Sequence, residues 1–295
     1  MSIQLQRATT QPDQTVTFQF DEPITRSAVG LSYFQLSYGR RDHHVRSMSI
    51  SLSVSQDSPT QISVTARAIL DDDSGNGIDL SASELGLVCI GAGEDDQIAL
   101  ANRNNIPSGG RSTPIQVDFE PQSQSAALAG FSLSYGQEDH HLERASALAA
   151  LTPANSIGAA INAGGTAVAI RSYAEMSDDS GNHSAIASID GGYAGIGAGC
   201  GVQVASLGQT QSSAPVAVTF PTPLTDAVAL IQGWRVEFEK ANDHHVQTIT
   251  AGTTSLVVNE NVVQLSNAQA TLRDNSGHVQ DNAVSGVDLL IVALS

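Results

Sequence analysis

The sequence predicts an all-β protein made of three tandem small antiparallel β-sandwich domains. Three observations lead to this prediction. The tripeptide Asp-His-His occurs three times, polar and apolar residues alternate along many segments, and no segment shows a convincing helical period. Alternation with a period of two residues is typical of a strand that buries one face. A repeat of roughly one hundred residues is the size of one small sandwich.

An acidic turn follows each Asp-His-His tripeptide. The tripeptides start 97 and 104 residues apart (42 to 139, and 139 to 243), and the turns start 30, 39 and 31 residues after them. The middle copy therefore carries an insertion of about eight residues, which we place in the Gly- and Ala-rich stretch 156–165. The tripeptides and their turns are Asp42-His43-His44 with Asp72-Asp73-Ser74-Gly75-Asn76, Asp139-His140-His141 with Asp178-Asp179-Ser180-Gly181-Asn182, and Asp243-His244-His245 with Asp274-Asn275-Ser276-Gly277-His278.

The strands predicted ahead of the tripeptide recur in the same order in every copy. An opening strand is followed by a proline, and a second strand alternates aromatic or aliphatic residues with polar ones. The opening strands are residues 16–20, 115–119 and 216–220, and the second strands are residues 34–38, 131–135 and 234–238.

The strands predicted after the tripeptide complete each copy. In the first copy, residues 48–54 and 62–70 place an apolar side chain at every second position. Because aspartate caps its own backbone in an Asx turn and glycine accepts a positive φ, Asp-Asp-Ser-Gly predicts the turn that follows. A short apolar strand then closes each copy at residues 90–93, 196–199 or 291–294. Five or six antiparallel strands per copy suffice for a small sandwich.

The charge divides evenly among the three copies, which indicates equivalent domains. Residues 1–107, 108–209 and 210–295 carry net charges of -6, -6 and -5, which together make the total of -17. Polar linkers at residues 102–113 and 208–214 supply the boundaries. Three joined sandwiches can surround a pseudo-threefold axis, like a trimer fused into one chain, or follow one another as beads on a string. We expect the fused trimer, alone or in a higher assembly.

The composition excludes several classes of function. With 13 basic against 30 acidic residues, the chain lacks the basic face that nucleic acids require, and its acidity disfavours anionic membranes. No run approaches the roughly 18 apolar residues of a membrane helix, and the polar N-terminus has no signal-peptide core. We expect a soluble protein that is cytoplasmic or released by a non-classical route. Cys89 and Cys200 are too few for a disulfide framework and are expected to be buried free thiols.

The two motifs carry the chemistry of the chain, and two interpretations of them stay open. In the first, a histidine of the tripeptide donates to an aspartate of the turn and pins the two loops together. In the second, imidazoles and carboxylates bind Zn, Mn, Fe or Ni, or Ca if only the aspartates coordinate. The candidate metal ligands are Asp42, His43, His44, Asp73, Asp139, His140, His141, Asp179, Asp243, His244, His245 and Asp274.

A catalytic interpretation is the alternative to a binding module. Histidine beside carboxylate can support acid-base catalysis, and the middle copy adds three residues on one face of a predicted strand. No nucleophile elbow, phosphate loop, His-Glu-x-x-His motif or dinucleotide fingerprint occurs. If the protein is an enzyme, the candidate catalytic residues are His140, His141, His183, Arg171, Tyr173 and Glu175.

The order of strands and turns in each copy resembles the H-type lectin domain. The local pieces that carry the resemblance are Ile62-Ser63-Val64-Thr65-Ala66 and the closing Ile291-Val292-Ala293. The resemblance implies a small six-stranded sandwich that forms trimers and binds N-acetylgalactosamine-type sugars. The glycine-phenylalanine step and the closing-strand tryptophan of that family are missing from all three copies, so no sugar-binding residue is carried across.

The main functional hypothesis is a non-enzymatic binding or structural module. Threefold equivalence without a catalytic fingerprint motivates it, with a glycan or a protein assembly partner as the ligand. A metal-dependent or acid-base enzyme that uses one copy or the pocket between copies is the first alternative. A component of a viral or injection-type particle is the second, because a fused pseudo-trimer can adapt one symmetry to another.

Overall fold

The computed structural model describes residues 3–94, 96–153, 166–239 and 242–295, and the insertion expected at residues 156–165 lies outside them. The described residues form twenty strands and a single 3-10 turn, Leu80–Ala82, so the all-β prediction is confirmed. None of them forms a helix that could cross a membrane. Cys89 and Cys200 are both buried and free, as expected.

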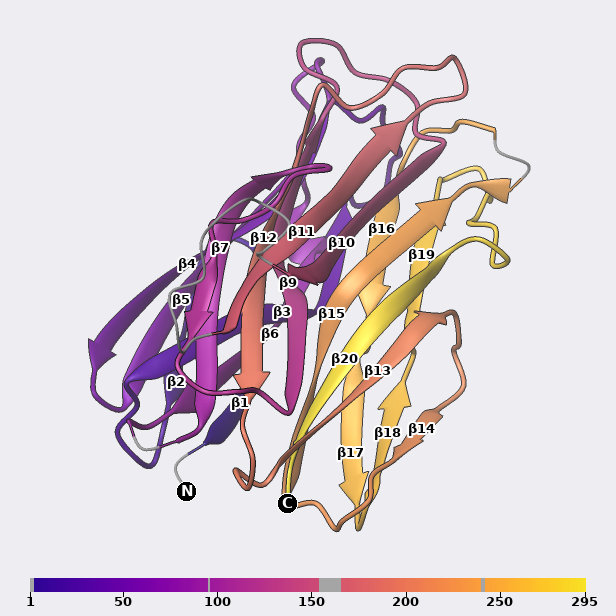
Figure 1. The fold of residues 1–295 in the computed structure, drawn as a ribbon. Coiled ribbons are helices and arrows are strands. Elements are labelled where there is room, and N and C mark those ends of the chain that lie inside the picture. The colour runs from indigo at the N-terminus through magenta and orange to yellow at the C-terminus, as the bar shows by residue number, and fades with distance from the viewer. Residues whose placement is uncertain (1–2, 95, 154–165, 240–241) are drawn as a thin grey trace.

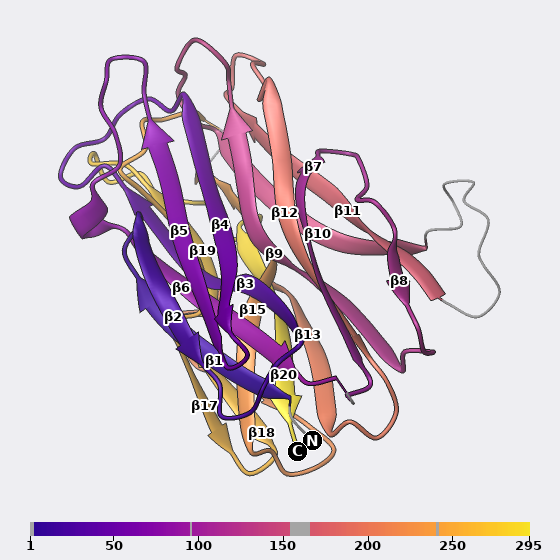
Figure 2. The ribbon, with the colours of Figure 1, turned by 90° about the vertical axis from the view of Figure 1, so that its left-hand side faces the viewer.

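The strands form three larger antiparallel sheets and one small sheet (Figures 1 and 2). The first sheet has the order β1 (Gln4–Thr10), β6 (Glu84–Ala92), β3 (Arg26–Ser37), β16 (Thr248–Gly252) and β19 (Gln269–Arg273). The second has the order β2 (Gln14–Gln19), β5 (Gln61–Asp71), β4 (Ser47–Ser58), β9 (Ser123–Ser134), β12 (Ile186–Ile196) and β7 (Ile98–Pro107). The third has the order β13 (Val202–Thr210), β20 (Gly286–Leu294), β15 (Asp226–Glu237), β10 (Arg144–Pro153), β11 (Thr166–Ser177) and β8 (Ile115–Val117). The small sheet has the order β14 (Val216–Thr219), β18 (Val262–Ser266) and β17 (Ser255–Asn259).

The alternation in the sequence matches the burial of the strands. In β5, Ile62, Val64, Ala66, Ala68 and Leu70 are buried, and the residues between them are half-buried or exposed. Side chains alternate across a sheet, so one face of β5 joins the core while the other meets solvent. The opening strands correspond to β2, β8 and β14, the strands before the tripeptide to β3, β9 and β15, and the closing strands to β6, β12 and β20.

The structure also contains three strands that the alternation does not predict. β1, β7 and β13 pair with β6, β12 and β20, and each lies at the outer edge of its sheet. An edge strand has one neighbour and buries little, so its sequence carries a weak apolar signal: in β13 no residue is fully buried. For the same reason residues 102–107, expected to be part of a polar linker, continue β7.

Each larger sheet contains a seam between strands that are distant in sequence. β3, before the first tripeptide, pairs with β16, after the third; Ser37 lies opposite Thr248. β9, before the second tripeptide, pairs with β4, after the first, and β15, before the third, pairs with β10, after the second. The three seams therefore link the three tripeptides in a cycle.

An aromatic cluster lies where the three sheets meet. Phe34 of β3, Phe131 of β9 and Trp234 of β15 are buried, and their ring centroids are 5.1 to 5.4 Å apart. In both views the three strands run through the middle of the molecule (Figures 1 and 2). Buried aromatic pairs at this separation stabilise a core beyond the area they bury. The aromatic cluster thus joins the three sheets in one core.

The strands after the third tripeptide are interrupted, unlike their counterparts. β4 and β5 form one long hairpin, whereas in the third copy β16 and β19 stay in the first sheet while β17 and β18 join the small sheet. The break follows Gly252, whose φ of 120° glycine adopts readily and other residues rarely do. A Cβ atom there would lie 2.2 Å from the carbonyl oxygen of Ser32, so glycine lets β16 approach β3 closely.

Candidate metal centre

Backbone bridges bring the three tripeptides together at one end of the seams. His43 exchanges two hydrogen bonds with Val246, Val45 with His140, and Leu142 with His244, all with N···O distances of 2.8 to 3.1 Å. Val45, Leu142 and Val246, each just after a tripeptide, have no exposed surface. These buried residues anchor the tripeptides, so the histidine positions are set by backbone pairing and core packing.

The second histidine of each tripeptide points toward the other two. The ring centroids of His44, His141 and His245 are 4.6 to 4.8 Å apart, with interplanar angles of 66° to 78°. One ring nitrogen of each lies within 4.8 Å of the others. We call these three residues the histidine cluster.

An aspartate from a neighbouring tripeptide lies beside each imidazole of the histidine cluster. Nδ1 of His44 lies 2.9 Å from Asp139, Nδ1 of His141 lies 3.2 Å from Asp243, and Nδ1 of His245 lies 3.9 Å from Asp42. The pairs run from the first tripeptide to the second, from the second to the third, and from the third to the first. A carboxylate only accepts, so in His44 and His141, which lie within hydrogen-bond distance, Nδ1 carries the proton and the lone pair of Nε2 is free for a ligand. The 3.9 Å between His245 and Asp42 is an ion-pair distance and too long for a hydrogen bond.

Two of these aspartates accept hydrogen bonds from backbone groups. The N–H of Asp73 donates to Asp139 (3.2 Å), and the N–H of Asn275 donates to Asp42 (3.1 Å). Burial opposes ionisation of Asp139, but the hydrogen bonds from His44 and from Asp73 outweigh it and lower the pKa of Asp139. The carboxylate that orients His44 is therefore kept charged.

The first histidine of each tripeptide contacts the acidic turn of its own copy. Its Nδ1 lies 3.3 Å from Asp72 for His43, 3.1 Å from Asp178 for His140 and 3.9 Å from Asp274 for His244. Each ring also packs on an aromatic residue, and the pairs are Tyr38 with His43, Tyr135 with His140 and Phe238 with His244. The two histidines of a tripeptide thus divide two tasks: the first contacts the turn and the second joins the histidine cluster.

The first aspartate of each turn is the buried member of these contacts. Asp72 accepts from the backbone N–H of Asn76 (2.7 Å) and from its side-chain amide (2.6 Å), and Asp178 and Asn182 repeat the arrangement at 2.8 and 2.6 Å. The hydrogen bonds within the turn therefore already satisfy this carboxylate without the histidine.

Two expected metal ligands contact neither the histidine cluster nor the first histidine of a tripeptide. Asp73 and Asp179 are exposed, and their side chains accept from the hydroxyls of Ser74 and Ser180. The buried positions are one residue earlier, at Asp72 and Asp178. The third turn supplies the signal that distinguishes them, because it reads Asp274-Asn275 and keeps the aspartate only at the first position.

The six candidate catalytic residues make separate contacts with different partners. On β11, Arg171 lies over the ring of Tyr173 at 4.7 Å, and Glu175 pairs with Arg144 at 3.6 Å. His183 is exposed and bridges to Ser177 through its backbone. His141 belongs to the histidine cluster and His140 contacts Asp178, so these contacts do not join the six residues around one centre.

The histidine cluster has the chemistry of a transition-metal site. Three neutral imidazoles suit Zn, Ni, Fe or Mn, whereas Ca requires oxygen ligands. Nitrogens bound tetrahedrally to one Zn ion at about 2.0–2.1 Å lie about 3.3 Å apart, so a small inward movement of the rings would close the site. For His44 and His141, the aspartates on Nδ1 supply the orientation that metal-binding histidines ordinarily receive from a second layer of residues.

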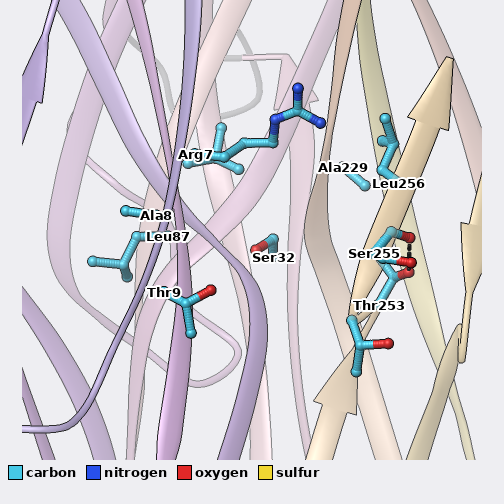
Figure 3. Close-up of a pocket in the computed structure, with 11 residues that line it drawn as sticks. Arg7, Ala8, Thr9, Ser32, Leu87, Ala229, Thr253, Ser255 and Leu256 are labelled. Carbon is cyan, nitrogen blue, oxygen red and sulfur yellow. Dashed lines mark hydrogen bonds between the residues drawn. The ribbon is translucent and has the colours of Figure 1, made fainter.

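A groove also lies beside each seam. The groove beside the β3–β16 seam has a volume of about 300 Å³, and Figure 3 shows Arg7, Ser32, Thr253 and Ser255 around it. The guanidinium of Arg7 is paired with Asp226 at 2.9 Å. Grooves beside the other two seams have volumes of about 320 and 350 Å³. Among the described residues that line these three grooves, none is aromatic, but a fourth groove of about 340 Å³ along β3, β16 and β19 is lined by Tyr33.

No protein-family model matches the chain, and no curated protein shows significant sequence similarity to it.

We expect the stability of the metal-free protein to fall as the pH is lowered from 7.5 to 5. Burial, with the imidazoles of His44 and His141, lowers the pKa of His245, and burial and His278 lower that of His244. A histidine with a lowered pKa in the folded state takes up protons preferentially when unfolded. Its contribution to stability is complete above the unfolded pKa of about 6.5 and is lost as the pH falls through the folded pKa.

Thermal unfolding in the presence of a chelator, measured across that pH range, checks this expectation. His245→Asn should flatten the profile, whereas substitution of the exposed His183 by asparagine should leave it unchanged. The pKa values of Asp139, Asp178 and Asp274 are lowered, so the stability these carboxylates contribute is lost only below about pH 3.9, the ordinary pKa of aspartate, and outside the range in which the histidines act. A wild-type profile that is flat from pH 7.5 to 5 would contradict the lowered pKa values of His244 and His245.

Proposed function

We propose that the protein is a non-enzymatic binding or structural module whose three sandwich copies are joined by a divalent transition metal at the histidine cluster. One observation carries the proposal: three imidazoles from tripeptides about a hundred residues apart lie with ring nitrogens within 4.8 Å of one another. Such a convergence is hard to attribute to loop pinning, because the first histidines already contact the turns.

The proposal includes a pseudo-threefold, fused-trimer arrangement of the copies 1–107, 108–209 and 210–295. Three features support it over beads on a string. The sheets are shared between strands of different copies, the His-Asp pairs run around all three tripeptides, and the aromatic cluster takes one ring from each copy. The resemblance to H-type lectin trimers agrees with the same arrangement.

We place the ligand of this proposal at the histidine cluster and not in the grooves. Sugar-binding surfaces stack an aromatic ring against the apolar face of the sugar, and the described lining of the four grooves supplies a single ring, the half-buried Tyr33. The histidine cluster, in contrast, has three imidazole ligands, two of which are hydrogen-bonded to carboxylates. Its fourth coordination position would be taken by water or by a group of a partner.

Metal bound only by the folded state adds to its stability. An ion present at about one hundred times its dissociation constant contributes about 2.7 kcal/mol. For a chain of this size we expect the midpoint of thermal unfolding to rise by about 4–5 °C. The comparison is between stripped protein with and without added Zn²⁺ at pH 7.5, followed by differential scanning calorimetry.

Elemental analysis and calorimetric titration of the stripped protein test the site itself. His141→Gln should lose one equivalent of bound Zn²⁺ and the corresponding thermal shift, while His183→Gln, outside the histidine cluster, should keep both. Less than one equivalent of any transition metal in the wild type, as purified and after incubation with excess Zn²⁺, would refute the proposal.

A further inference from the structure

The third copy contains a second group of potential metal ligands, formed by His244, Asp274 and His278. One ligand atom of each lies within 4.8 Å of the others. The two imidazoles are stacked, with centroids 3.9 Å apart and an interplanar angle of 18°. Oδ2 of Asp274 lies 2.5 Å from Nδ1 of His278 and 3.9 Å from Nδ1 of His244. Two imidazoles and one carboxylate oxygen therefore lie close together.

The other two copies have the same turn with different chemistry. Asn76 and Asn182 occupy the position of His278, and each donates its side-chain amide to the buried aspartate at 2.6 Å. His278 keeps both backbone features of that turn: its N–H donates to Asp274 at 2.8 Å and its carbonyl accepts from the N–H of Asp274. An amide nitrogen has no free lone pair, whereas an imidazole nitrogen has one. The third copy thus exchanges a hydrogen-bond donor for a metal ligand without changing the fold of the turn.

The carboxylate of this group is positioned before any ion arrives, and the two stacked rings need to tilt toward each other for their in-plane lone pairs to meet at one ion. Asp274 is 4% exposed, and one of its oxygens accepts from the backbone N–H groups of Ser276 and His278, which leaves the other directed at the two imidazoles. The ring of His244 packs against Phe238 at 5.0 Å. His278 is about half exposed, so an ion can enter from solvent.

We propose that His244, Asp274 and His278 form a second divalent-metal site, specific to the third copy and separate from the histidine cluster. Two imidazoles and one carboxylate suit Zn, Ni, Co or Fe in the divalent state, with water at the remaining positions. Binding displaces the proton shared by Asp274 and His278, so the site releases protons as it fills. An open site on one copy makes the three copies chemically unequal.

Calorimetric titration of the stripped full-length chain with Zn²⁺ at pH 7.5 tests this site. The wild type is expected to bind two equivalents, and His278→Asn, which copies the turn of the first two copies, is expected to bind one. The reverse substitution, Asn76→His, should raise the count to three, because His43 and Asp72 are already in place 3.3 Å apart. His278→Asn should fold normally, with an unchanged circular dichroism spectrum.

The same titration distinguishes failure at the second site from failure at the histidine cluster. His141→Gln removes a ligand of the histidine cluster and should leave one equivalent, which a further His278→Asn substitution abolishes. Equal stoichiometry in the wild type and in His278→Asn would overturn the second site. Loss of both equivalents in His141→Gln would overturn its independence.

Discussion

Replacing Phe131 by alanine is expected to lower the free energy of unfolding by about 3–5 kcal/mol. The ring is 2% exposed and packs between Phe34, at 5.4 Å, and Trp234, at 5.1 Å. Its loss would leave a cavity where β3, β9 and β15 meet, and the surrounding strands cannot collapse into it because each is fixed in its own sheet. Urea denaturation followed by circular dichroism measures the change.

Trp234→Phe is the matched control for this substitution. It places in the third copy the residue that the first two already have, and it removes an indole N–H that is buried without a hydrogen-bond partner among the described residues. The smaller ring loses some packing, but the loss of an unpaired buried donor offsets it. We expect a stability within about 1.5 kcal/mol of the wild type. A Trp234→Phe loss as large as that of Phe131→Ala would show that the aromatic cluster does not tolerate exchange among its copies.

Gly252→Ala is expected to destabilise the protein by about 2–5 kcal/mol. Two costs combine at this position. The φ of 120° is strained for any residue with a Cβ, and that Cβ would lie 2.2 Å from the carbonyl oxygen of Ser32 and 2.7 Å from the Cα of Tyr33. Both neighbours are backbone atoms of β3, so relief requires the seam between β16 and β3 to open.

Gly75→Ala separates the two costs. Gly75 also has a positive φ, of 89°, but a Cβ there would meet nothing within 4 Å. We expect a cost of about 1–2 kcal/mol from the backbone alone. Thermal and urea unfolding of the two variants give the comparison. Equal losses would mean that close approach at the seam contributes nothing and that backbone strain alone explains Gly252.

The strands that could be predicted are those that bury one face. Ile62 to Leu70 alternate because β5 lies inside a sheet, with β2 and β4 on its two sides. Strand β13 could not be predicted in the same way, because at the sheet edge its side chains are only partly buried. The seams were also beyond prediction, since the pairing of Ser37 with Thr248 depends on contacts across more than two hundred residues.

The residues of the candidate site could be predicted from the sequence, but the different roles of the two histidines in each tripeptide could not. The repeated tripeptide identified His44, His141 and His245, and the turn identified Asp274. Which histidine of a pair faces its neighbours depends on the backbone bridges between tripeptides, and these follow from the seams. The sequence shows that the third turn has His278 where the other two have asparagine. That this histidine could bind metal together with His244 became clear only from the contact between the two rings.

The shared sheets bear on how the chain is made. Strand β3 is synthesised early, yet its partner β16 begins at Thr248, so one edge of β3 has no native neighbour until most of the chain has left the ribosome. Unpaired strand edges attract other strands, and pairing over long sequence separations is slow. We therefore expect a chain truncated before β16 to aggregate through the open edge of β3 instead of forming a smaller folded protein.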